Sequence, residues 1–304
     1  MPGQSLPPTI DSWFAAHERA RDVVQNLGVA LLAWSLGELV LLPVLSGRVV
    51  TPIWPPVGLA VAVAYLGGFR LLPGIVLGSL AVNYGTQSLP AVLLLALSQV
   101  IQPVLVVRIL RALKFDPRLE RVRDPVILSL VAAPIGALAA APFVAASSFA
   151  AGLAAQSGLV YDLWLWVLRN WLGTMLIAAL MFAWVKGRAT VWTPARIAEA
   201  VALLLIMALS AQVIFGLWGF FAERHVPVPF IFFPIVGWAG LRFGPRGAAT
   251  VVALMASFAL AVAGARLGPF ADYPVEFIQF LLFLFLALGS LSGQFDTKDA
   301  GVGK

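Results

Sequence analysis

The sequence predicts an all-α protein, a polytopic bundle of transmembrane helices with about ten spans. Of its 304 residues, 61% are hydrophobic and only 11% are charged, whereas soluble domains average about 25% charged residues. Apolar runs close to the roughly 20 residues that cross a hydrocarbon layer follow one another along the chain. Lys and Arg fall mainly in the short connections between these runs, as is usual in membrane proteins. A soluble core could not enclose so much apolar surface.

Ten apolar runs are expected to form the spans. The second, third and eighth are short or interrupted by Pro, so re-entrant or broken helices are an alternative, and eight to ten spans are predicted. Pro and Gly inside such runs free backbone groups that only neighbouring helices or a polar cavity can satisfy. The runs cover residues 25–46, 50–68, 70–87, 89–112, 125–151, 161–185, 196–221, 226–241, 247–265 and 274–293.

The positions of Lys and Arg predict the orientation of the bundle. With ten spans and a cytoplasmic N-terminus, nearly all of these residues lie on the cytoplasmic side, and only Arg48, Arg224 and Arg266 lie outside. Both termini are therefore predicted to be cytoplasmic. We interpret the net charge of +6 as a sign of topology and expect no nucleic-acid partner.

The predicted organisation is a single transmembrane domain over residues 25–293. A cytoplasmic or interfacial segment, residues 1–24, precedes it, and a cytoplasmic tail, residues 294–304, follows it. The tail is too short and polar to fold. We therefore expect an output module to be absent from these residues or carried by a separate polypeptide.

Two distant stretches share the same Pro, Gly and Arg pattern, P-x-V-G followed by G-x-R-x-x-P. The pattern predicts two membrane hairpins with basic turns, at Arg70 and at Arg242, on the cytoplasmic side. The matching positions suggest a degraded parallel repeat in which Gly68 pairs with Gly240. The alternative is that Gly, Arg and Pro are simply common at tight cytoplasmic turns. The two stretches cover residues 54–83 and 233–247.

The composition argues against an enzyme. Cys is absent and only two His residues occur, His17 and His225, so thiolate catalysis, a bis-His haem and a Ser-His-Asp relay all lack their parts. No phosphate-binding or dinucleotide-binding glycine motif is present. We therefore expect no catalytic residue, no cofactor and no metal site.

Two ionisable residues lie within predicted spans, where a charge is costly unless it is paired or hydrated. Glu38 lies in the first span and Arg169 in the sixth. They could form an intramembrane ion pair. Alternatively, Arg169 belongs to a pocket for an anionic or aromatic ligand, or its side chain extends to the membrane interface.

The other candidate ligand-binding residues are polar or interrupt a helix. Gln99 and Gln102 share one helix face, although such amides commonly bond one helix to another. Trp54 could also be an ordinary anchor at the outer interface, and the prolines that follow it leave nearby carbonyls available to a ligand or to water. The predicted ligand-binding residues are Trp54, Pro55, Asn83, Gln99, Arg169 and Asn170.

Residues 54–83 resemble the membrane-associated sensor domain family, type one, whose members usually read W-P-P-x-G and then G-x-x-x-x-P-x-x-x-L-G-x-x-x-x-N. A second block, W-A-G-L-R-F-G-P-R-G-A from Trp238 to Ala248, and a later G-P-F also look like this family. Family members often have an acidic residue in a W-L-G-D block, where this chain has Thr174. The residues that match the first block are Trp54, Pro55, Pro56, Gly58, Gly68, Pro73, Gly78 and Asn83.

The resemblance implies a sensory domain that detects ligands within or beside the membrane and is typically joined to a cytoplasmic signalling module. It favours a bacterial inner-membrane signal-transducing domain that binds an unknown small ligand in the helix bundle. The partners expected are the lipid bilayer and either a cytoplasmic signalling module or a membrane protein, with a homodimer as one arrangement. The first alternative is a small-molecule transporter or its substrate-capturing subunit. The second is a structural partner of a larger membrane complex.

Overall fold

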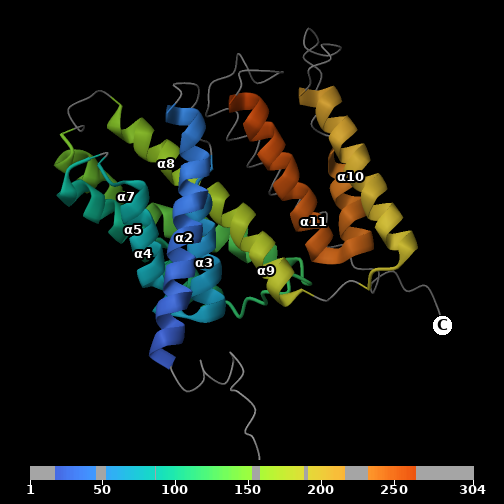
Figure 1. Ribbon diagram of the computed structural model, residues 1–304, viewed down its shortest axis with the longest axis horizontal. Helices are drawn as coiled ribbons and strands as arrows, with labels where there is room; N and C mark the ends of the chain where they lie inside the picture. The colour runs from blue at the N-terminus through green and yellow to red at the C-terminus, as the bar shows by residue number, and fades with distance from the viewer. Residues whose placement is uncertain are drawn as a thin grey trace, which may run out of the picture.

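The computed structural model describes residues 18–45, 53–85, 87–152, 158–187, 191–215 and 232–264. Its regular elements in this part of the chain are all helical (Figure 1), which confirms the predicted all-α class. The number of membrane crossings and their orientation remain predictions, and the tenth predicted span lies outside the described residues. Five helices are long and apolar enough to cross a membrane: Glu18–Leu41, Leu89–Ala112, Arg123–Ala150, Leu159–Lys186 and Pro194–Gln212.

The first helix, α2 (Glu18–Leu45), begins before the predicted start at residue 25 and packs against α4 (Leu72–Val82) through two glycines. A Cβ at Gly74 would lie 2.4 Å from the Asn26 carbonyl oxygen, and one at Gly78 would lie 2.7 Å from the Ala33 Cβ. Glycines four residues apart let two helices approach closely, a common arrangement between membrane helices.

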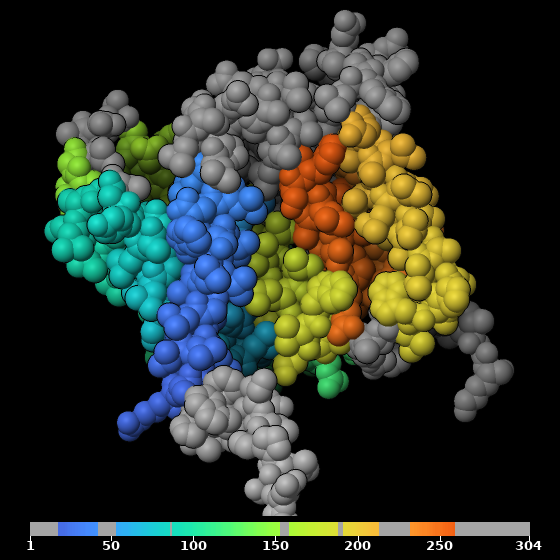
Figure 2. All heavy atoms as spheres, viewed as in Figure 1, coloured from blue at the N-terminus to red at the C-terminus, as the bar shows by residue number. Residues whose placement is uncertain are grey.

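The outer face of α2 is apolar and exposed at the surface of the bundle (Figure 2). Leu27, Leu31 and Leu39 are 58%, 60% and 64% exposed. The helix α10 (Pro194–Phe215) exposes a similar row of leucines and isoleucines. Soluble proteins rarely expose contiguous apolar surface of this extent, whereas lipid tails would cover it without cost.

The helix α3 (Pro55–Gly67) lies at the centre of the bundle. Each residue from Val57 to Ala62 is buried, and α3 contacts α2, α4, α5 (Leu89–Ala112) and α8 (Leu159–Gly173). Its 13 residues measure about 20 Å, less than the hydrocarbon thickness of about 30 Å. The predicted second span is therefore a short helix enclosed by protein.

The chain turns after α3 at Gly68, whose φ of 90° favours glycine. A short 3-10 turn, η1 (Phe69–Leu71), then leads into α4 and completes the first predicted hairpin. Pro73 lies in the first turn of α4, where its missing N–H costs no helical hydrogen bond. This hairpin brings the two ends of residues 54–83 to the same end of the bundle.

Two long helices contain π-helical segments. One is formed by α6 (Arg123–Val126), η2 (Ile127–Ala132) and α7 (Ala133–Ala150), and the other by α8, η3 (Thr174–Ala178) and α9 (Ala179–Lys186). Isolated π-turns of this kind occur often at functional sites.

A proline explains an unusual hydrogen bond between these two long helices. The Ala133 amide donates to the Leu128 carbonyl, and Pro134 has no N–H, so the Ser129 carbonyl loses both of its possible helical donors. The indole Nε1 of Trp171 donates to this carbonyl at 2.6 Å. A side chain of α8 therefore satisfies a backbone acceptor that the π-segment η2 leaves free.

The second predicted hairpin is α11 (Phe232–Gly264), whose two arms meet at Gly244 with φ 64° and ψ −157°. The sequence comparison paired Gly68 with Gly240, but the backbone turns at Gly244, which is therefore the structural counterpart of Gly68. The counterpart of Arg70, two residues after the turn glycine, is then Arg246. The alignment differs because Gly240 lies within the first helical arm.

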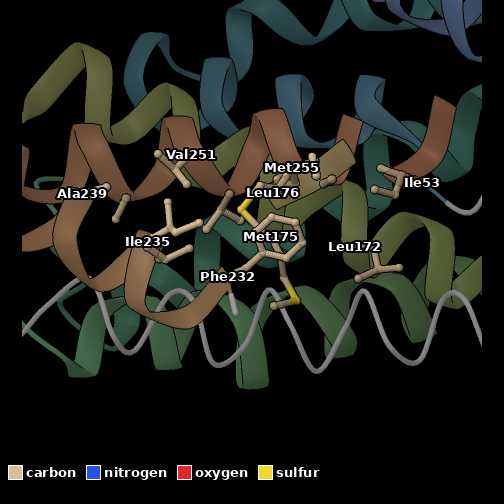
Figure 3. Close-up of a cluster of buried hydrophobic side chains, with 14 of the residues drawn as sticks. Ile53, Leu172, Met175, Leu176, Phe232, Ile235, Ala239, Val251 and Met255 are labelled. Carbon is tan, nitrogen blue, oxygen red and sulfur yellow. The ribbon is translucent and has the colours of Figure 1, made fainter. Parts of the chain in front are cut away.

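Both arms of α11 pack against the long helix formed by α8, η3 and α9, through a buried apolar cluster (Figure 3). Phe232 and Ile235 of the first arm and Met255 of the second arm join Leu172 and Met175. This cluster holds the second hairpin against η3. The first hairpin also contacts η3, through its helix α3.

Basic turns gather at one end of the bundle. Arg70 pairs with Asp22 at the start of α2, and the Asn26 amide donates to the Arg70 carbonyl at 3.0 Å. The buried Asp124, at the start of α6, accepts hydrogen bonds from Arg121 Nε at 2.8 Å and from the Asp116 amide at 3.1 Å. The hydrogen bond to Asp124 raises the pKa of the Arg121 guanidinium.

Arg246 fixes the turn of the second hairpin to the end of α9. Its guanidinium donates to the carbonyls of Ala183, Trp184 and Gly187 at 3.2, 3.0 and 2.8 Å. The Ala183 and Trp184 carbonyls lie in the last turn of α9 and the Gly187 carbonyl directly follows it, at a helix end where some acceptors lack backbone partners. Apart from Arg169, the Lys and Arg residues in the described ranges lie in loops or near helix ends and turns, as is usual in membrane proteins.

Replacing Gly78 by leucine should destabilise the α2 and α4 pair. A side chain at this position would contact Ala33 and the Ala30 carbonyl, and such overpacking typically costs about 1–3 kcal/mol. The melting temperature in detergent, followed by tryptophan fluorescence, should fall by several degrees. Gly28→Leu is the matched control, because nothing lies within 4 Å of its Cβ position. Equal melting temperatures for the two variants would contradict this packing.

Replacing Arg246 by methionine should loosen the end of α9. The change removes three charge-assisted hydrogen bonds, each typically worth about 1.5–3 kcal/mol. Hydrogen exchange at residues 183–187 should become faster, while exchange in α5 stays as in the wild type. Arg118→Met changes an exposed arginine at the same end and should leave both regions unaffected. Unchanged exchange at residues 183–187 in the Arg246 variant would show that the cap does not hold this helix end.

Candidate functional site

Two glycines hold the start of α3 against α8. The Trp54 amide donates to the Arg169 carbonyl at 3.0 Å. A Cβ at Gly173 would lie 2.0 Å from the Trp54 carbonyl oxygen, and a Cβ at Gly58 would lie 2.2 Å from the Gly173 carbonyl oxygen. Neither position can hold a side chain without separating the helices. The W-P-P-V-G and W-L-G sequences are therefore packed directly against each other.

This packing places the Trp54 backbone on the face of α8 that Arg169 and Asn170 border. Gly173 follows Arg169 by four residues and Asn170 by three, so both side chains border it on the helix surface. The Trp54 backbone occupies the space above Gly173. Asn170 is fully buried, and its Nδ2 donates to the Trp166 carbonyl at 2.9 Å.

The third wall of the site is α5. Gln102, 1% exposed, donates through Nε2 to the Thr174 hydroxyl at 3.3 Å, and that hydroxyl donates to the Asn170 carbonyl at 2.9 Å. The Thr174 hydroxyl therefore bonds to both neighbours without introducing a negative charge.

Gln99 lies one turn before Gln102 on the same face of α5 and is 7% exposed. The Ser88 hydroxyl at the start of α5 bonds to the Ala150 carbonyl at the end of α7, and α8 begins shortly afterwards. The helices α5 and α8 therefore run in the same direction, which places Gln99 and Asn170 on the same side of the bond between Gln102 and Thr174. We call this site the α3–α5–α8 junction; it comprises Trp54, Gln99, Gln102, Arg169, Asn170 and Thr174.

Four polar atoms of the junction are buried without a hydrogen-bond partner. They are two donors, Trp54 Nε1 and Arg169 Nε, and two acceptors, Gln99 Oε1 and Asn170 Oδ1. A buried polar group without a partner typically costs about 1–3 kcal/mol, so such groups are rare and call for an explanation. The only other such side-chain atoms in the described ranges belong to Arg21 and Gln212, on α2 and α10.

The structure separates Glu38 from Arg169. The ion pairs among the described residues, within 4.0 Å, include neither side chain, and Glu38 lies on α2. Arg169 instead meets α3 through its backbone carbonyl. The arrangement favours the ligand-pocket interpretation of Arg169 over the ion pair.

The other predicted residues lie at helix ends. Pro55 is the first residue of α3, directly after Trp54. Asn83 caps the C-terminal end of α4, where its Nδ2 donates to the Ser79 carbonyl at 2.8 Å. Arg70 and Arg242 lie at the basic end, where Arg242 donates to Glu199 of α10.

Sequence reasoning missed the part that Gly173 and Gln102 play in the site. The short W-L-G sequence was the only available signal for Gly173, because its role depends on contact with Trp54. Gln102 shares a face with Gln99, which suggested a polar wall but not the bond to Thr174. The described residues form no group of three or more His, Cys, Asp or Glu that could hold a metal ion. The junction is suited to orienting a polar small molecule through hydrogen bonds and one positive charge.

Comparison with known proteins identifies the family of this chain. The model of the family MASE1, membrane-associated sensor domain 1, matches residues 24–293, which include all of the junction. No curated protein and no solved structure gives a significant match. The match covers well over half of the chain, so this protein belongs to the MASE1 family of membrane sensory domains.

Proposed function

We propose that this MASE1 chain is a sensory domain of the bacterial inner membrane that binds a small ligand at the α3–α5–α8 junction. One observation supports the site above all. Of the predicted ligand-binding side chains, Trp54, Gln99, Arg169 and Asn170 meet at one junction, each with a buried polar atom that lacks a partner. A bound polar molecule would satisfy these atoms.

The same proposal includes a route from the junction to a cytoplasmic or membrane partner. Thr174 is the first residue of η3, and its hydroxyl bonds to the Asn170 carbonyl within the site. A π-segment has a hydrogen-bond register different from that of the α-helix on either side, so a change at Asn170 can alter the rotation of α9. The end of α9 is bonded to Arg246, which would transmit the change to the second hairpin.

A ligand can drive such a change only if it binds one helix arrangement better than another. The junction meets this requirement if the ligand draws α3, α5 and α8 together by bonding to a side chain on each. Trp54, Gln99 and Asn170 are those side chains. Ligand binding would then be coupled to the helix arrangement through the interface between α3, α5 and α8.

Ligand binding should change the surroundings of the end of α9. The chain has no Cys, so Lys186→Cys, on the exposed last turn of α9, provides a single position for an environment-sensitive fluorophore. In nanodiscs, a fraction of bacterial small-molecule extract should change its emission. Asn170→Leu and Gln99→Leu, which remove the acceptors, should each raise the concentration needed by about tenfold or more.

Arg118→Gln is the control and should respond like the parent. Sensing at this junction would be refuted if no fraction changed the emission. It would also be refuted if the emission of the Asn170 and Gln99 variants changed as much as that of the parent. Uptake of the active compound into protein-containing liposomes would instead favour a transporter.

Thr174→Val should weaken the packing between α5 and η3. Valine has nearly the same shape but no hydroxyl, so the buried Gln102 amide loses its acceptor, at a typical cost of about 1–3 kcal/mol. We expect a lower melting temperature and a smaller fluorescence response at Lys186→Cys. Thr174→Ser retains the hydroxyl and should restore both quantities. If valine and serine behave alike, the hydroxyl has no such role.

A further inference from the structure

The chemistry of the junction restricts the kind of ligand that it can accept. The donors and acceptors lie on different parts of the site. Trp54 and Arg169, which provide the unpartnered donors, are joined by a backbone hydrogen bond of 3.0 Å. The unpartnered acceptors, on Gln99 and Asn170, are at least nine-tenths buried on α5 and α8.

Arg169 forms no ion pair with a described residue. No carboxylate among these residues lies within 4.0 Å of its guanidinium, and Asp162, seven residues earlier on α8, acts on it only from a longer distance. Arg169 comes about 15 Å along the helix from Leu159, at 1.5 Å per residue, which is deep in a helix long enough to cross the membrane. A charge without a close partner at such a depth is unfavourable. An anion beside the guanidinium removes this penalty, and a carboxylate or phosphate oxygen can accept from Arg169 Nε and Trp54 Nε1 together.

The acceptors require the opposite chemistry. Asn170 Nδ2 is already committed to the Trp166 carbonyl at 2.9 Å, so the oxygen of the same amide is the atom left to bond. Gln99 Oε1, one turn before Gln102, is likewise a buried oxygen without a partner. A simple anion such as acetate has no hydrogen to donate to these oxygens. A hydroxyl or amino group on the ligand does.

We propose that the junction binds a small anion that also has a hydrogen-bond donor, such as a hydroxy or amino carboxylate or a hydroxylated phosphate ester. The anionic group lies at Trp54 and Arg169, and the hydroxyl or amino group lies at Asn170 and Gln99. The ligand thereby bridges α3, α5 and α8. This inference rests on the proposed function, because it names the ligand class of the same site.

The test uses the whole chain in phosphatidylcholine nanodiscs and measures melting temperature. The probes are hydroxy acids, amino acids and glycerol phosphates, each compared with its neutral amide or alcohol and with the matching acid that lacks the donor. At least one hydroxylated or aminated anion should raise the melting temperature, and its neutral and donor-free counterparts should bind at least tenfold more weakly. Arg169→Gln should weaken binding of the anion tenfold or more, whereas Lys186→Gln, an exposed cation of the same long helix, should not.

The possible outcomes separate the two proposals. Neutral counterparts that bind as tightly as the anion, with binding retained in Arg169→Gln, would overturn the ligand class but leave sensing at the junction intact. If no compound shifted the melting temperature and the Arg169→Gln protein were more stable than the wild type, water alone would hydrogen-bond to the four unpartnered atoms. That result would overturn both the ligand class and sensing at the junction. An Arg169-dependent shift on adding phosphatidylglycerol to the nanodiscs, without any soluble anion, would identify a lipid headgroup as the source of the same chemistry.

Discussion

The arrangement of the bundle depends on the absence of side chains at Gly58 and Gly173. The Trp54 and Gly173 carbonyl oxygens occupy the spaces that Cβ atoms would fill at Gly173 and Gly58, so backbone meets backbone where α3 joins α8. Because α3 is short and enclosed by other helices, its position determines theirs. The same contact bonds the Trp54 backbone to the Arg169 carbonyl, so one packing requirement fixes both the centre of the fold and one wall of the candidate site.

Prolines contribute by removing hydrogen-bond donors. Pro134 leaves the Ser129 carbonyl without a helical partner, and the Trp171 indole replaces it. In a membrane each free backbone group costs several kcal/mol, so such a replacement holds the two interrupted helices together at a defined register. The Trp171 indole thereby links η2 to α8, which continues into η3, and Thr174 at the start of η3 bonds to Gln102 and Asn170 of the junction.

The basic end of the bundle is organised differently, by charges on helix ends. Arg246 bonds to three carbonyls at the end of α9, and Arg70 and Arg242 pair with acids on α2 and α10. The turns of both hairpins are therefore attached to helices outside the hairpins.

The sequence by itself determined the all-α class, the positions of most helices and the clustering of basic turns, because these follow from local apolar length and from where charges can avoid lipid. It also identified Trp54, Gln99, Arg169 and Asn170 as polar residues in unusual places. The tertiary structure was needed to show that the Trp54 backbone lies against Arg169 and Gly173, that no ion pair joins Glu38 to Arg169 among the described residues, and that the second hairpin turns at Gly244. Contacts between distant glycines and backbone carbonyls depend on how helices pack. The sequence pattern of one helix does not show which neighbouring helix will contact its glycines.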